Sequence, residues 1–121
     1  MNENFRRFQT EADPFGRVWE VEFRWQQNGI SIRHADTLDV KFNVWTTDEP
    51  KQEKVIALTH PALLKLSQET GHPLTDAWCM KLAALQVKYM IESDEDMEKT
   101  LVTPAYPELA QRAQSLAPVP R

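Results

Sequence analysis

Apolar and polar residues alternate in the amino-terminal third of the chain. Between residues 18 and 27 the odd positions are apolar, namely Trp19, Val21, Phe23 and Trp25. Alternation with aromatic and β-branched residues is typical of a strand with one buried face. Asn28-Gly29 follows and favours a two-residue hairpin turn, because both residues tolerate positive φ. We therefore expect residues 18–27 to pair with residues 30–34, with His34 opposite Phe23 on the apolar face.

A second alternating run predicts a further strand. Its even positions are apolar, namely Leu38, Val40, Phe42 and Val44. A three-residue turn at residues 35–37 keeps these side chains on the apolar face of the hairpin. Trp45 has an odd number, so it is expected on the opposite, polar face. Residues 55–58 are apolar and predict a fourth strand, which completes an antiparallel meander over residues 18–58.

Two helices are predicted after the meander. Pro61 and Gly71 suit the first turn and the end of a short helix over residues 60–70. Thr75 is the capping residue of a longer helix that runs to residue 92. Twelve of the fifteen residues from 77 to 91 are apolar, and Lys81, Lys88 and Glu92 form one narrow polar stripe. Residues 108–116 predict a weak third helix.

The long helix carries the main functional hypothesis. One sheet face covers only part of a helix that is apolar around most of its circumference, so a second copy of the chain or another protein is expected to cover the rest. Trp45 adds to this hypothesis, since tryptophan is enriched at interface hot spots. The preferred interpretation is a non-enzymatic partner-binding module that forms a homodimer. Its expected interface residues are Trp45, Met80, Val87, Met90 and Ile91.

Composition limits the classes of function. The 121 residues carry a net charge of -4, and five of the acids lie between residues 92 and 98. No basic cluster marks a nucleic-acid binder, and no apolar run has the length of a membrane span or a signal peptide. We therefore expect a cytoplasmic protein with one α+β domain over residues 1–121. It comprises an amino-terminal arm (1–16), the meander (18–58), a helical part (60–92), and an acidic turn, weak helix and tail (93–121).

Candidate chemistry supports only an alternative hypothesis. Cys79 lies in the apolar helix and is expected to be an inert buried thiol. His60 and His72 precede prolines and lack metal-ligand spacing, so no metal and no cofactor is expected. The alternative is a small-molecule binder or minor enzyme with a pocket between the sheet and the long helix. The residues expected to line this pocket are His34, Trp19, Trp25, Trp78 and Tyr89.

Overall fold

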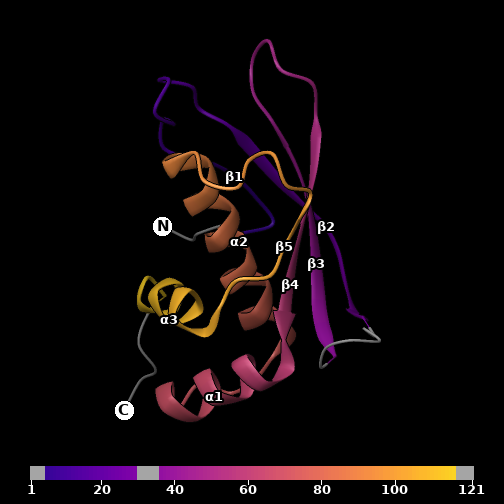
Figure 1. Ribbon diagram of the computed structural model, residues 1–121, viewed down its shortest axis with the longest axis vertical. Coiled ribbons are helices and arrows are strands. Elements are labelled where there is room, and N and C mark those ends of the chain that lie inside the picture. The colour runs from indigo at the N-terminus through magenta and orange to yellow at the C-terminus, as the bar shows by residue number, and fades with distance from the viewer. Residues whose placement is uncertain (1–4, 30–35, 117–121) are drawn as a thin grey trace.

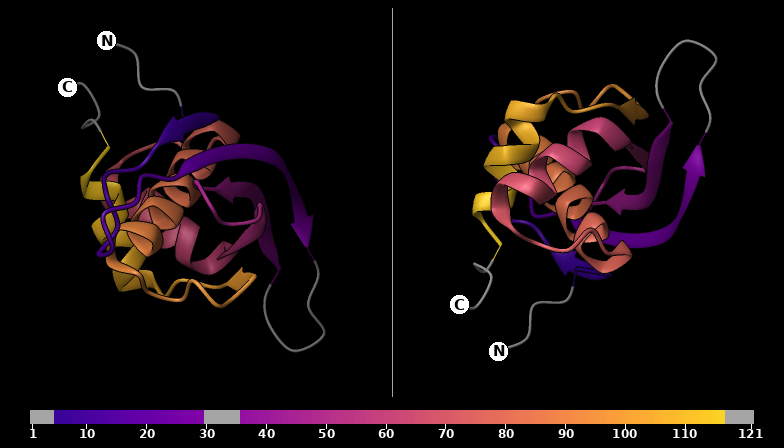
Figure 2. Two further views of the ribbon diagram at one scale, coloured as in Figure 1. Left: turned by 90° about the horizontal axis from the view of Figure 1, so that it is seen from above. Right: turned by 90° about the horizontal axis from the view of Figure 1, so that it is seen from below.

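The fold is α+β, as the pattern predicts (Figure 1). The computed structural model describes residues 5–29 and 36–116. A five-stranded sheet has the order β1 (Arg7–Gln9), β2 (Glu20–Gly29), β3 (Thr37–Trp45), β4 (Gln52–Thr59) and β5 (Leu101–Val102). The first four strands form an antiparallel meander, and β5 pairs with β4 in parallel. The three helices are α1 (His60–Thr70), α2 (Asp76–Ser93) and α3 (Tyr106–Gln114), and they lie on one side of the curved sheet (Figure 2).

The predicted hairpin at Asn28-Gly29 is wrong. Both residues belong to β2, where Asn28 pairs with Leu38 and Gly29 pairs with Thr37. The first alternating run therefore pairs directly with the second, and Phe23 lies opposite Phe42 rather than His34. The direct pairing joins two long apolar ladders, which outweighs the local preference of Asn-Gly for a turn. Residues 30–35, including His34, lie outside the described part of the chain.

A β-bulge changes the face on which Trp25 lies. The register between β2 and β3 shifts between Phe23 and Trp25, so Trp25 pairs with Lys41 on the polar face of the sheet. Its side chain is 39% exposed, whereas Trp19 and Val21 are buried as expected. The placement of Trp25 in the core is therefore wrong, because a bulge inserts one residue and inverts every later position.

Trp45 lies on the polar face, as its position in the alternation predicts. It pairs with Glu20 across the sheet and is half-buried. The side chains of Arg7 and Lys51 cover its ring, with the guanidinium carbon 5.4 Å and the ammonium nitrogen 4.4 Å from the ring centre. These cation–π contacts shield part of the indole from water without burying it in the core.

The long helix forms as expected, but the same chain covers it. The Thr75 side chain caps α2 by accepting a hydrogen bond from the Trp78 backbone N–H at 3.2 Å. Ten of its eighteen residues are buried against the sheet, α3 and the aromatic residues of the amino-terminal segment. Four residues expected at an interface are among them: Met80, Val87, Met90 and Ile91, with exposures of 8%, 0%, 0% and 1%. They are core residues of the protomer, and the argument for uncovered apolar surface on α2 is wrong.

A buried lysine fastens the connection between α2 and β5. Lys54 lies on β4 and is 2% exposed. Its ammonium group donates to the carbonyls of Met97 and Lys99 at 2.5 and 2.6 Å. Burial lowers the pKa of Lys54, and the nearby charge of Glu98 opposes this shift. The Lys54 side chain therefore helps to hold the turn after α2, where Met97 also packs against the core.

A buried carboxylate organises the connection between β1 and β2. Asp13 is 7% exposed and accepts hydrogen bonds from the backbone N–H groups of Phe15 and Arg17, from the Arg17 side chain, and from the Trp19 indole, each at 2.9 Å. Burial alone would raise the pKa of Asp13. The hydrogen bonds from Trp19, Arg17 and Phe15 outweigh burial and lower this pKa to about 2.

Stability is therefore expected to depend on the charge of Asp13. The folded-state pKa of about 2 lies below the ordinary aspartate value of 3.8, so the stabilisation is complete above about pH 4 and is lost as the pH falls towards 2. Asp13→Asn should lower the free energy of unfolding at pH 7 by about 1–3 kcal/mol. It should also flatten the pH dependence between pH 2 and 4, measured by urea denaturation. Glu69→Gln on exposed α1 is the control, and an unchanged pH slope in Asp13→Asn would contradict the assignment.

Candidate ligand-binding groove

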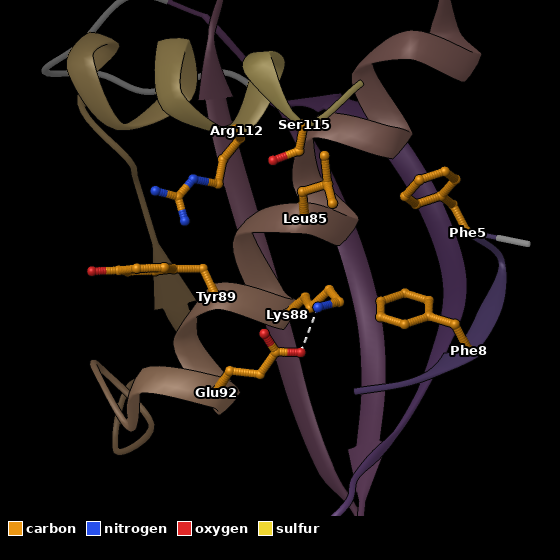
Figure 3. A pocket seen from close by; sticks show the side chains of 8 residues that line it. All are labelled: Phe5, Phe8, Leu85, Lys88, Tyr89, Glu92, Arg112 and Ser115. Atoms are coloured by element: carbon orange, nitrogen blue, oxygen red, sulfur yellow. Dashed lines mark hydrogen bonds and ion pairs between the residues drawn. The ribbon is translucent and has the colours of Figure 1, made fainter. Parts of the chain in front are cut away.

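The exposed stripe of α2 forms the floor of a groove between the amino-terminal segment and α3 (Figure 3). The groove has a volume of about 450 Å³. Leu85, Lys88, Tyr89 and Glu92 lie at successive spacings of three, one and three residues, which place them on one helix face. We call this site the α2–α3 groove. Its lining residues are Phe5, Phe8, Leu85, Lys88, Tyr89, Glu92, Arg112 and Ser115.

The two walls of the groove differ in chemistry. Phe5 and Phe8 form the wall on the side of β1, with ring centres 6.4 Å apart and ring planes at 65°. Arg112 on α3 and Ser115, the residue that follows this helix, lie on the opposite side of the groove (Figure 3). Apolar side chains therefore lie on one side of the α2 floor and polar side chains on the other, with Leu85 between them. This arrangement suits a molecule that has one apolar and one polar end.

Two charges on the floor neutralise each other. The Lys88 ammonium lies 2.6 Å from a Glu92 carboxylate oxygen, and the same oxygen accepts a hydrogen bond from the Glu11 backbone N–H at 2.8 Å. The carboxylate thereby fastens the amino-terminal segment to the carboxyl end of α2. Since Glu92 is paired with Lys88, the positive charge of Arg112 on the opposite wall is not balanced within the groove.

Arg112 has a buried donor that no described residue satisfies. Its guanidinium carbon lies 4.0 Å from the centre of the Tyr89 ring, and one terminal nitrogen donates to the Gln111 side-chain oxygen at 2.9 Å. Among the described residues, however, the buried Nε has no hydrogen-bond partner. A buried donor without an acceptor costs about 1–3 kcal/mol. Such a group in a natural protein requires an explanation, and a role in binding an anion is one.

The Tyr89 ring stacks against the Arg112 guanidinium and holds it in position. The pKa of the Tyr89 hydroxyl is raised, first by its hydrogen bond to Glu95 and then by burial and the charge of Glu95. The hydroxyl therefore stays neutral, and the ring stays available for stacking with Arg112. Arginine stacked on an aromatic ring is held in position while its N–H groups remain free to bind an anion.

The residues predicted to line one pocket do not meet. Tyr89 lines the α2–α3 groove, and Trp25 lines a separate groove beside β2. Trp19 is buried, with its indole N–H bonded to Asp13, and Trp78 is buried with its ring stacked on His72 at 4.8 Å. His34 lies outside the described residues. Core side chains fill the space between the centre of the sheet and α2, and the groove that Trp25 lines lies between β2 and the start of α2.

The thiol of Cys79, the candidate nucleophile of the sequence, is buried. Cys79 is 3% exposed, and burial, with a contribution from Asp76, raises the pKa of its thiol to about 11. A thiol of this kind is protonated and inert at neutral pH. The expectation of a buried thiol is confirmed.

The sequence pattern does not predict the walls of the groove. The stripe of Lys81, Lys88 and Glu92 predicted an exposed face of α2, and that face is the floor. More than seventy residues of sequence separate the floor from Phe5 and Phe8. Arg112 lies in the weak third helix, and no local pattern connects these residues with the floor. Tyr89 was the single groove residue among the predicted pocket residues.

Comparisons do not assign the groove to a known class. No protein-family model, no curated protein and no solved structure matches the chain. Within residues 5–29 and 36–116, no group of three or more histidine, cysteine, aspartate or glutamate side chains could hold a metal ion. No helix in the same ranges is long and apolar enough to cross a membrane.

Replacement of Arg112 tests whether the fold needs this side chain. Arg112→Met removes the unsatisfied donor and also a cation–π contact of about 0.5–1 kcal/mol. Because these effects oppose each other, the free energy of unfolding should change by less than about 1 kcal/mol. Leu109→Ala, in the buried face of the same helix, should cost about 2–5 kcal/mol. Denaturant titration of both variants makes the comparison, and a loss above about 2 kcal/mol in Arg112→Met would show that Arg112 is structural.

Proposed function

We propose that the protein binds a small amphipathic carboxylate in the α2–α3 groove and does not transform it. The observation that carries this proposal is the buried Arg112 Nε, which lacks a hydrogen-bond partner among the described residues. A carboxylate accepts two parallel hydrogen bonds from a guanidinium group, and this geometry gives both affinity and orientation. The ligand would satisfy the donor that the folded chain leaves unpaired.

The rest of the groove supports a ligand with an apolar body. Phe5, Phe8 and Leu85 provide apolar surface opposite Arg112. The volume of about 450 Å³ lies within the range of small-molecule sites, which is roughly 300–1,000 Å³. Local charge also favours an anion, because Lys88 and Arg112 outnumber Glu92 in a chain of net charge -4.

The surroundings of Ser115 and Lys88 favour binding over catalysis, because neither side chain is activated for a reaction. Ser115 is the hydroxyl on the wall of the groove, and it has no hydrogen bond to a histidine or a carboxylate among the described residues. A serine nucleophile needs such a base to be activated. Lys88 is held in its ion pair with Glu92 at 2.6 Å. The arrangement therefore supports recognition of an acid rather than attack on one.

Direct titration tests the proposal. Isothermal titration calorimetry with octanoate should detect binding, whereas octylammonium, which has the same chain and the opposite charge, should not bind measurably. Arg112→Met should weaken octanoate binding roughly 10–100-fold, which corresponds to the loss of a hydrogen-bonded charge pair of about 1.5–3 kcal/mol. Phe8→Ala should also weaken binding, because it removes apolar contact.

Two controls separate this site from general hydrophobic binding. Arg24→Met removes an arginine that is exposed on β2 and should leave octanoate affinity unchanged. Octanol has the same apolar chain without the charge and should bind at least about tenfold more weakly than octanoate. Equal binding of octanol and octanoate, or equal affinity of Arg112→Met and the unsubstituted protein, would overturn the proposal.

Self-association is a separate hypothesis that fewer observations support. The homodimer was inferred from apolar surface on α2, and the protomer itself buries that surface. Among the expected interface residues, Trp45 alone keeps substantial exposed surface, and Arg7 and Lys51 partly cover it. We therefore infer that the protein is a monomer.

Sedimentation distinguishes the two oligomeric states. At micromolar concentration we expect the mass of a single chain, 14.0 kDa, because the large apolar side chains of α2 are not available to a second copy. A species of twice that mass would contradict this expectation. If Trp45→Ser then restored the single-chain mass while Leu64→Ser did not, Trp45 would be the anchor of the dimer. Leu64 is the matched control because it is an exposed apolar residue on α1.

A further inference from the structure

β2 continues past the end of β1 at the edge of the sheet. β1 pairs with β2 only from Glu20 to Glu22, and beyond this pairing the Phe23 N–H donates to the Arg6 carbonyl at 2.7 Å. On its other side, β3 follows β2 as far as Gly29. In the described ranges, no strand pairs with the outer edge of β2 from residue 24 to residue 29. Six residues of strand correspond to about 20 Å of edge that no strand of the described chain covers.

A second groove, of about 690 Å³, lies along this open edge. One wall is β2, with Phe23, Trp25 and Gln26, and the other is the start of α2, with Asp76, Met80 and Lys81. We call it the β2-edge groove. The Gln26 side-chain amide links the walls by donating to the Asp76 carbonyl at 3.3 Å. A strand edge that faces a helix across a groove is the geometry in which an extended peptide adds to a sheet.

The groove begins where β1 ends. Phe5 and Arg6 precede β1 and line the groove together with β2 and α2. A peptide in the groove would therefore continue the line of β1 and run antiparallel to β2. Its backbone would pair with β2, and alternate side chains would point towards α2 or towards solvent.

Folding of the core does not require Trp25 to lie at this edge of the sheet. The bulge after Phe23 turns the indole out of the core, and the core is closed without it. Natural sheets protect their edges, since unpaired backbone groups and apolar side chains promote association. An indole that is 39% exposed beside unpaired strand edge is therefore a feature to be explained. Tryptophan is the residue most enriched where partners bind.

The charges beside the groove favour an acidic partner. Arg6 and Lys81 are the cations that line it, and Asp76 is the acid. Lys81 is exposed and, among the described residues, forms no ion pair. The positive end of the α2 dipole lies at the same end of the helix. In a chain of net charge -4, a locally cationic groove selects against a basic peptide.

We propose that an extended, acidic segment of a partner protein adds to the outer edge of β2 and lies in the β2-edge groove. Backbone pairing with residues 24–29 provides affinity, Trp25 provides apolar contact, and Lys81 selects an acidic side chain. The proposal is independent of the carboxylate ligand proposed above, because Arg112 and Lys88 do not line this groove.

Fluorescence anisotropy with defined peptides tests this proposal. The probe is a labelled, capped hexapeptide of alternating valine and glutamate. The expected result is saturable binding, with at least about tenfold weaker binding of the peptide in which lysine replaces glutamate. A glutamate peptide with alternate backbone amides methylated should lose binding, because it cannot pair with a strand edge. Equal binding of the charge-reversed peptide, or of the methylated peptide, would overturn the proposal.

Two charge-reversal variants locate the site. Lys81→Glu should weaken binding of the glutamate peptide roughly tenfold. Lys51→Glu is the matched control, since it makes the same charge change beside Trp45, and it should leave affinity unchanged. Trp25→Ala should also weaken binding, whereas Arg112→Met should not. Equal affinities of the two lysine variants would contradict this location, and a stable dimer that pairs two β2 edges would show that the occupant is a second copy of the chain.

Discussion

The burial of α2 is the constraint on which the rest of the structure depends. A helix with apolar side chains around most of its circumference cannot be satisfied by one sheet face. The chain solves this by bringing α3 and the aromatic residues of the amino-terminal segment, such as Phe8, against the sides that the sheet leaves open. One stripe, through Lys81, Leu85 and Lys88, stays accessible. Because the covering elements stop at the borders of this stripe, grooves form along it and its residues line them. The candidate sites are consequences of how α2 is covered.

The sequence pattern predicted the elements better than it predicted their neighbours. Alternation placed Trp45 on the polar face, and the Thr75 cap placed the start of α2, because each depends on adjacent residues. The bulge between Phe23 and Trp25 could not be predicted from the sequence, because the apolar positions alternate without interruption through it. Asn28-Gly29 gave a strong local signal for a turn, but pairing with the longer apolar ladder of β3 prevailed.

The candidate groove shows why a binding site was harder to predict than a strand. Its floor was visible as the polar stripe of α2, because helical spacing is a local property. Its walls come from Phe5 and Phe8 at one end of the sequence and Arg112 at the other, and only tertiary packing brings them together. The predicted aromatic residues were dispersed instead. Trp19 and Trp78 are core residues because their indole rings have partners inside the fold, Asp13 and His72 respectively.

The acidic residues after α2 explain how the cations in the grooves remain available. Carboxylates at the carboxyl end of a helix oppose its dipole, so Glu92 and the acids that follow destabilise α2 unless they are compensated. The compensation comes from Lys88, which pairs with Glu92, and from Lys54, whose ammonium binds the carbonyls of Met97 and Lys99. Neither interaction uses Arg112 or Lys81. The chain therefore neutralises its acidic turn with other lysines. Arg112 in the α2–α3 groove and Lys81 in the β2-edge groove form no ion pair with a carboxylate of the described chain.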